Sequence, residues 1–444
     1  MAITETKTKY GQIHGVQKDG YTVFRGVPYA KPPVGEKRFC PPEEPVCWEG
    51  VYKADHFGCV CPQTEHEPDS FYGKEFYLDP EFGMKQSEDC LYLNIWTPAN
   101  TVDEKLPVAF WIHGGAFMHG FSHESEFDGA AYCERGVILV TINYRLGAFG
   151  FLAHPWLSEE SGVGRSGNYA ILDQIAALKW VKENIAAFGG DPENITVFGQ
   201  SAGCMSVQTL VSSPLTENWI SKAIFQSAGG YDTGLNRDMP LSEAETIGQE
   251  FVELSGAKSL EELRAIPAEQ IVELQEEFGR VNPSRMLSFV PNIDDYLLTC
   301  GYNEAVTERK IKDIPYMLGS TADDIGVFPE MKEKGEHGGI YKGCINWSLA
   351  LEKLGRKPAY VYYFTRALLG DDAGAFHSSE LWYMFGTLGR SWRPKTEGDY
   401  ALSKEMMDDW TNFMKTGNPN AEGKDDWKPC TKDDPYVQVL DVRE

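Results

Sequence analysis

The chain has 444 residues, and hydrophobic residues make up 42% of it, which is ample material for a large core. Its 66 acidic and 41 basic residues give a formal net charge of −25. That charge argues against nucleic acid or an anionic membrane surface as the partner, and its simplest interpretation is a solvated outer surface. No apolar run approaches the ~20 residues that a membrane-spanning helix needs, so we expect no membrane span.

The amino-terminal stretch and the cysteines bear on the compartment. The sequence MAITETKTKYGQIHG lacks the basic region and the apolar stretch of a signal peptide. We therefore expect a cytoplasmic protein, or a secreted one if a leader was removed before residue 1. The 10 cysteines are too few for a disulfide scaffold and include no CxxC pair, so most of them are expected to be buried thiols.

Short apolar stretches alternate with helical ones along the chain. Buried strands are expected within residues 106–115, 136–144, 194–199 and 219–226. Residues 168–188 carry apolar side chains at helical spacing and predict a helix that Asn168 caps. This rhythm predicts one α/β domain over residues 1–444, with a mostly parallel sheet and helices on both faces.

The stretch from about residue 231 to 311 interrupts this rhythm. It is rich in helix formers, as in LSEAETIGQEFVELSG, and it predicts a helical cap over the site. Acidic side chains outnumber basic ones between Arg237 and Arg280. A rim of that sign would disfavour anionic substrates, although a solvated outer face explains the same charge.

Two serines stand in nearly identical surroundings, GQSAG at 199–203 and FQSAG at 225–229. Ser201 follows an expected strand and precedes a stretch that can continue as a helix. Its flanking glycines permit the sharp turn of a nucleophile elbow. Ser227 also follows a strand, but Phe225 replaces the first glycine and would crowd the turn. We expect Ser201 to be a nucleophile and Ser227 to be structural.

A series of motifs in this order resembles the type-B carboxylesterase family of α/β hydrolases. They are FRGVPYAKPP (24–33), SEDCLYLNIW (87–96), WIHGGAF (111–117), NYRLGAFGF (143–151) and FGGDPENITVFGQSAG (188–203). The resemblance is dense from about residue 10 to 230 and returns in patches towards the carboxyl terminus. It implies the α/β-hydrolase fold, a mostly parallel central sheet flanked by helices with a helical cap insertion, and no cofactor.

A serine hydroxyl needs a base to remove its proton, and the base needs an orienting acid. In α/β hydrolases the chain order is serine, acid, histidine. The resemblance places the acid at Asp324, where the family usually has glutamate, and the histidine at His377. The alternatives are Asp323, read as a polar neighbour, and His337, which stands in a charged, glycine-rich loop.

The resemblance also implies an oxyanion hole, formed by the backbone N–H groups of Gly115, Ala116 and Ala202. Ala116 stands where the family commonly has a third glycine, and an alanine keeps the N–H group. The alternative is that HGGAF forms only an ordinary glycine turn. Aromatic residues near the motifs are candidates for an apolar acyl pocket, or else simple core: Phe117, Phe289, Phe328, Trp382, Tyr383 and Phe385.

The resemblance implies further pairs and leaves other motifs unused. Glu88 and Arg145 match a buried ion pair of the family, and Cys61 and Cys90 match a disulfide of its secreted members, which would stay as thiols in the cytosol. The GVGRSG stretch at 162–167 matches a dinucleotide-binding pattern, but no strand is expected before it. His113, His119 and His123 cluster without a metal-binding spacing, so no metal is expected.

These features predict a serine esterase that hydrolyses small-molecule carboxylic esters through an acyl-enzyme intermediate. Soluble, neutral, short-acyl or aryl-acyl esters are the expected substrates. A feruloyl-type esterase acting on plant cell-wall esters is the runner-up, and a lipase comes after it, because no long apolar surface is evident. A binding protein of the same fold that has lost its nucleophile is the other class, and Ser201, Asp324 and His377 argue against it. The oligomeric state, the acyl group and the alcohol stay open.

Overall fold

A single large sheet runs through the molecule. The computed structural model describes residues 2–443, and its 12-stranded sheet has the order β1-β2-β3-β5-β7-β6-β8-β9-β10-β11-β12, with β4 paired to β2. The strands are β1 (Glu5–Thr8), β2 (Gly11–Gln17), β3 (Thr22–Pro28), β4 (Val51–Ala54), β5 (Tyr92–Thr97), β6 (Leu106–Ile112), β7 (Ile138–Ile142), β8 (Gly190–Gln200), β9 (Lys222–Gln226), β10 (Tyr316–Thr321), β11 (Tyr360–Phe364) and β12 (Gln438–Leu440).

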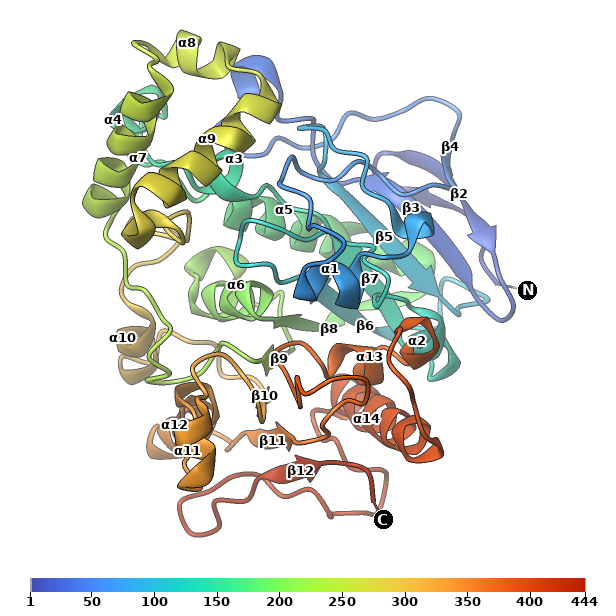
Figure 1. Ribbon diagram of the computed structural model, residues 1–444. Coiled ribbons are helices and arrows are strands. Elements are labelled where there is room, and N and C mark those ends of the chain that lie inside the picture. The colour runs from blue at the N-terminus through green and yellow to red at the C-terminus, as the bar shows by residue number, and fades with distance from the viewer. Residues whose placement is uncertain (1, 444) are drawn as a thin grey trace.

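The part of the sheet from β7 to β12 is parallel, whereas β1, β2, β3 and β5 join it through antiparallel pairs. Helices lie on both sides of it (Figure 1). The α-helices are α1 (Phe71–Phe76), α2 (Ala130–Glu134), α3 (Gly147–Phe151), α4 (Pro155–Glu160), α5 (Tyr169–Asn184), α6 (Ala202–Ser212), α7 (Leu241–Ser255), α8 (Leu260–Ala265), α9 (Ala268–Val281), α10 (Tyr302–Thr307), α11 (Pro329–Glu333), α12 (Gly339–Lys353), α13 (Leu381–Met384) and α14 (Glu397–Thr416). The short 3₁₀ helices are η1 (Gly35–Lys37), η2 (Pro80–Phe82), η3 (Ile185–Phe188), η4 (Pro214–Thr216), η5 (Pro283–Arg285) and η6 (Leu388–Arg390). The expected mostly parallel sheet flanked by helices is thus confirmed.

The core forms one layer on each face of the sheet. Successive strand residues point to opposite faces. Phe110 of β6 and Val197 of β8 therefore belong to the cluster that includes α5 and α6, whereas Trp111 and Phe198 belong to the cluster with α13 and α14. This explains why both strands read as unbroken apolar runs rather than as alternating ones.

The helix predicted over 168–188 forms as α5 followed by η3, and Asn168 occupies the N-cap position as predicted. Its side chain makes no capping hydrogen bond. The Asn168 amide instead donates to the backbone oxygen of Asn292 at 2.9 Å, and its side-chain oxygen accepts from the Asn292 N–H at 2.9 Å. Asn168 therefore fastens the segment after α9 to the start of α5.

The stretch 231–311 contains helices α7 to α10. Figure 1 shows α7, α8 and α9 beside α3 and α4 at one end of the molecule. The Ser158 hydroxyl of α4 donates to Glu245 of α7 at 2.5 Å, and the Ala148 N–H of α3 donates to Gln275 of α9. The insertion is helical as expected, and these contacts attach it to α3 and α4.

Candidate active site

Ser201 lies on a sharp turn between β8 and α6. Its backbone has φ 56° and ψ −127°, and its N–H donates to the Gln226 oxygen at 2.9 Å. A Cβ atom on Gly203 would lie 2.1 Å from the Ile112 oxygen, and one on Gly199 would lie 2.6 Å from the Gly203 carbonyl carbon. Both glycines are therefore required by close backbone contact, as the elbow pattern predicts.

Ser227 adopts almost the same backbone, with φ 55°. Phe225 does not crowd that turn, because its ring packs on Tyr316 and Trp347 at centroid distances of 5.7 and 5.0 Å. The expected crowding of the Ser227 turn by Phe225 is therefore wrong. Burial separates the two serines instead: Ser227 is 1% exposed, whereas Ser201 is half-buried and lines a cavity.

His377 and Asp324 form a close pair beside Ser201. His377 Nδ1 lies 2.6 Å from Asp324 Oδ1, and the Asp324 carboxylate also accepts from the N–H groups of Thr321 and Ile325 at 3.1 and 2.8 Å. Burial alone would lower the pKa of His377, but the adjacent Asp324 carboxylate outweighs it and raises that pKa. Asp324 therefore fixes the Nδ1 tautomer and favours the charged imidazole.

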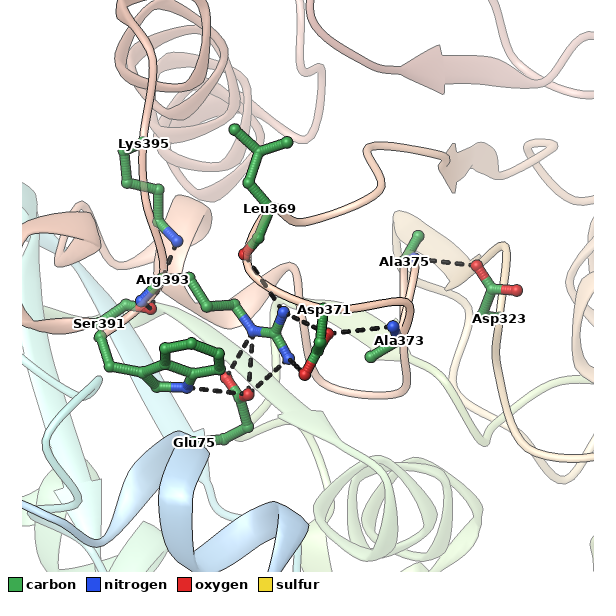
Figure 2. Close-up of polar contacts among 10 residues, drawn as sticks. Glu75, Asp323, Leu369, Asp371, Ala373, Ala375, Ser391, Arg393 and Lys395 are labelled. Carbon is green, nitrogen blue, oxygen red and sulfur yellow. Dashed lines mark hydrogen bonds and ion pairs between the residues drawn. The ribbon is translucent and has the colours of Figure 1, made fainter.

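The two alternatives lie elsewhere. The Asp323 carboxylate pairs with Lys332 and accepts from the Ala375 N–H at 2.9 Å, as Figure 2 shows for Ala375. The His337 ring stacks on Tyr341 with centroids 4.0 Å apart. Neither residue lines the cavity that contains Ser201 and His377.

Gln200 contacts His377, which the sequence did not lead us to expect. Its side-chain nitrogen lies 3.1 Å from His377 Nε2. Within residues 2–443, no hydrogen bond joins Ser201 Oγ to His377, although both line the same cavity. Catalytic hydrogen bonds often tighten only when substrate is bound. The GQSAG motif contains the signal for this contact, because a sharp turn at Ser201 places the side chain of Gln200 at the same edge of the sheet.

The loop after β6 approaches Ser201 with its backbone. Gly115 and Ala116 have φ values of 96° and 56°, and a Cβ on Gly115 would lie 2.2 Å from the His119 oxygen. Gly114, Gly115 and Ala116 all line the cavity, while Ala202 is the first residue of α6. The first N–H groups of a helix have no partner inside it. The turn therefore accepts alanine at 116 but requires glycine at 115.

The comparisons with known proteins agree with this geometry. The model of the "Carboxylesterase family" matches residues 3–343 and 344–443. The chain belongs to the carboxylesterase family. It is 33% identical to para-nitrobenzyl esterase of Bacillus subtilis over 98% of this chain and 94% of that one. It is also 33% identical to fumonisin B1 esterase of Sphingopyxis macrogoltabida, over 95% of this chain and 83% of that one.

Solved structures show the same likeness. A structure titled PNB esterase aligns with a TM-score of 0.86 at 31% identity, covering 99% of this chain and 96% of the other. Carboxylesterase EST55 of Geobacillus stearothermophilus aligns with a TM-score of 0.83 at 32% identity, with the same shares covered. The resemblance, the α/β-hydrolase fold and the expectation of an enzyme that hydrolyses carboxylic esters are confirmed. Among the described helices, none is both long and apolar enough to span a bilayer.

The cavity of this carboxylesterase has a volume of about 230 Å³. It is lined by His66, Tyr72, Phe76, Tyr77, Gly114, Gly115, Ala116, His119, Glu124, Glu126, Phe127, Gln200, Ser201, Ile325, His377, Ser378 and Leu381. No residue of the 231–311 insertion belongs to this wall, so at this cavity the expected cap does not form the roof.

The six aromatic residues expected in an acyl pocket do not line this cavity either, and Tyr383 and Phe385 among them are buried in the core. Phe117 and Trp382 are core residues, which pack on Phe151 and Phe76 at 4.9 and 5.6 Å between ring centroids. Phe289 is buried against Phe251 in the insertion, and Phe328 is 61% exposed. The aromatic wall consists instead of Tyr72 and Phe76 of α1, Tyr77 directly after it, and Phe127 of the loop between β6 and α2. None of these residues lies in a motif that marked the site.

A buried ion pair fastens α1 to the chain that carries His377 (Figure 2). The Arg393 guanidinium donates to Glu75 of α1 at 2.6 and 2.9 Å, and to Asp371 at 2.7 and 2.9 Å. The Arg393 and Glu75 side chains are 0% and 1% exposed. The ring of Phe71 also meets that of Phe376 edge-on at 4.9 Å. These contacts hold the aromatic wall and the segment around His377 in one relative position.

The predicted pairing of Glu88 with Arg145 is wrong. Arg38 donates to Glu88 at 2.6 Å, and Arg145 donates to Asp173 of α5 at 2.7 and 2.8 Å. Each arginine faces a carboxylate in the geometry that suits its planar guanidinium, so the four charges form two separate pairs.

The Cys61 and Cys90 side chains are neighbours, as expected. Both are buried free thiols, and the Cys90 thiol is hydrogen-bonded to Cys61. That contact, together with burial, raises the pKa of Cys90 well above its usual value. The Cys90 sulfur is therefore held in the unreactive, protonated form.

Proposed function

We propose that this chain is a serine carboxylesterase in which Ser201 is the nucleophile, His377 the general base and Asp324 the acid that orients it. The observation that carries the proposal is the 2.6 Å contact of His377 with Asp324 at the cavity where Ser201 sits on a strained turn. The Asp324 contact leaves the proton on Nδ1, so Nε2 is the nitrogen that accepts the serine proton once the Gln200 amide releases it.

The reaction follows from this geometry. The Ser201 oxygen attacks the ester carbonyl carbon while His377 Nε2 takes its proton. The carbonyl oxygen becomes an oxyanion, and the N–H groups of Gly115, Ala116 and Ala202 donate to it. Collapse of this intermediate breaks the ester bond, and His377 returns the proton to the departing alcohol. Water then hydrolyses the acyl-enzyme by the same steps, which requires the Gln200 amide to release His377 Nε2.

Soluble, small-molecule esters of short-acyl or aryl-acyl type are the proposed substrates. A cavity of about 230 Å³ with Tyr72, Phe76 and Phe127 in its wall suits a single flat ring better than a long chain. A feruloyl-type esterase is the alternative within this class, because a hydroxycinnamoyl group is such a ring. A lipase would need a long apolar surface at an oil interface.

The test is a rapid-mixing experiment with p-nitrophenyl acetate, followed by labelling with a sulfonyl fluoride. The proposal predicts a burst of p-nitrophenol close to one equivalent per chain, and a labelled peptide that contains Ser201. Absence of turnover, or a label on a peptide without Ser201, would contradict it. A panel of acetate, butyrate, hydroxycinnamate and palmitate esters then ranks the substrate classes, and a preference for palmitate would favour a lipase.

A further inference from the structure

Two buried carboxyl groups lie in the wall of the cavity that contains Ser201. Glu124 and Glu126 stand on the loop between β6 and α2 and are 7% and 1% exposed. Glu124 Oε1 accepts from the Phe121 N–H at 2.8 Å. The side chain of Glu126 is hydrogen-bonded to that of Glu124, and no donor of the described chain reaches the buried Glu126 Oε2. A buried acceptor without a partner is uncommon in folded proteins and calls for an explanation.

The surrounding groups do not neutralise these carboxyls with an ion pair. The nearby cation is Arg390, which donates to the Ser125 oxygen at 2.9 Å and to Asp128 at 2.7 Å. The other titratable groups in the cavity wall are His66, Tyr72, Tyr77, His119 and His377. His377 pairs with Asp324, and burial lowers the pKa of His66 and His119. His66 and His119 are therefore neutral at pH 7 and supply no positive charge to the carboxyl pair.

Burial sets the charge of the carboxyl pair. It raises the pKa of Glu124 to about 7, and burial together with the neighbouring Glu124 raises that of Glu126 well above its usual value. The pair therefore retains protons at neutral pH, and this end of the cavity is polar without being strongly charged. The rest of the wall is largely aromatic, from Tyr72, Phe76 and Phe127.

We propose that Glu126 determines specificity by accepting a hydrogen bond from a neutral hydroxyl group, phenolic or aliphatic, at the far end of the ester part that occupies this cavity. Such a hydroxyl would give Glu126 Oε2 the partner that the protein itself does not supply. Glu124 is the positioning residue, held by the Phe121 N–H. The inference rests on the proposed function, because the cavity selects esters only if Ser201 is the nucleophile.

The experiment compares matched ester pairs that differ only by hydroxyl against methyl. One pair places the ring in the acyl part, methyl 3-(4-hydroxyphenyl)propanoate and methyl 3-(4-methylphenyl)propanoate. The other places it in the alcohol, 2-(4-hydroxyphenyl)ethyl acetate and 2-(4-methylphenyl)ethyl acetate. The wild-type enzyme is expected to prefer the hydroxyl member of at least one pair by about tenfold in kcat/KM.

Two variants test whether Glu126 causes the preference for the hydroxyl ester. Glu126→Leu should bring that ratio to about one, whereas Glu126→Gln, which keeps an acceptor oxygen, should retain a preference. If Glu126→Leu fails to fold, calorimetric binding of the same two esters to Ser201→Ala gives a second measurement, since that variant should bind the hydroxyl member more tightly without turnover.

The outcomes separate the two proposals. Turnover of the methyl esters with no hydroxyl preference in either pair would overturn the inference and leave the esterase intact. An unchanged ratio in Glu126→Leu, or a stronger preference for an aminomethyl analogue, would also overturn it. No turnover of any ester, p-nitrophenyl acetate included, would contradict the proposed function itself.

Discussion

Arg393 and Glu75 form a buried ion pair between segments that are far apart in the sequence. The three Arg393–Glu75 hydrogen bonds measure 2.6, 2.9 and 3.0 Å, and Glu75 belongs to the same short helix as Tyr72 and Phe76 of the cavity wall. Arg393 follows the chain that carries His377 and Phe376, and its guanidinium lies 5.0 Å from the Phe376 ring centroid. The pair thus joins the aromatic wall of the cavity to the neighbourhood of the base.

Arg393→Met should therefore be strongly destabilising. Removing one partner leaves the other charge buried without compensation, which costs about 3–5 kcal/mol in the free energy of unfolding. The double variant Arg393→Met/Glu75→Met should recover part of that loss. Urea denaturation of the three proteins measures this. Lys9→Met, which removes exposed pairs with Glu44 and Glu183, is the matched control and should change stability far less. Equal effects of Arg393→Met and Lys9→Met would contradict the account.

Gly203→Ala should disrupt the turn that presents Ser201. The added methyl group would lie 2.1 Å from the Ile112 oxygen, so either β6 or the start of α6 must move. We expect loss of activity together with a lower thermal midpoint. Gly389→Ala serves as the control, because nothing lies within 4 Å of a Cβ at that position and its φ is not positive. A fully active Gly203→Ala enzyme would show that the turn tolerates a side chain.

Asp324→Asn should lower kcat by about 10⁴-fold, because the amide favours the wrong tautomer of His377. Asp323→Asn should have a much smaller effect, since the Asp323 carboxylate contacts Lys332 and the Ala375 N–H rather than the imidazole. Steady-state kinetics on both variants, with circular dichroism to verify folding, makes the comparison. A larger loss at Asp323 would move the acid one residue upstream.

The acidic limb of the pH profile should report His377. Activity requires the neutral imidazole, and Asp324 holds the pKa of His377 above its usual value despite burial. The kcat/KM of the free enzyme should therefore fall as the pH drops through a value above about 6.5. In Asp324→Asn the raising effect of that carboxylate is lost and burial is opposed only by Glu380, so the residual activity should persist to lower pH. If the acidic limb of Asp324→Asn lies at the same pH as that of the wild type, the limb reports a group other than His377.

Local patterns predicted the fold well, because the information they need lies within a few residues. The elbow at Ser201 depends on Gly199 and Gly203, and the buried strands depend on their own apolar runs. Asp324 and His377 came from the family resemblance, and their roles stay predictions. Most errors concern partners distant in the chain, as for Asn168, whose side chain bonds Asn292 rather than its own helix. The crowding expected from Phe225 is a local error, since Ser227 adopts a positive φ beside it.

The same reasoning explains what was missed in the cavity wall. Whether a carboxyl group such as Glu126 faces solvent or a cavity depends on the elements packed around its loop, and no periodicity encodes that. The ion pairs of Arg38 with Glu88 and Arg145 with Asp173 show the same limit. In each case the residue types were visible in the sequence, but their pairing is a property of the assembled sheet and helices.

The most direct test of the central claim compares Ser201→Ala with Ser227→Ala. The two serines share the sequence around them and nearly the same backbone φ, so the pair is an internally matched control. With both proteins shown to be folded, kcat/KM for p-nitrophenyl acetate should fall by about 10⁴-fold or more in Ser201→Ala. It should stay within about tenfold of the wild type in Ser227→Ala. Loss of activity in a folded Ser227→Ala enzyme with an active Ser201→Ala enzyme would contradict the account.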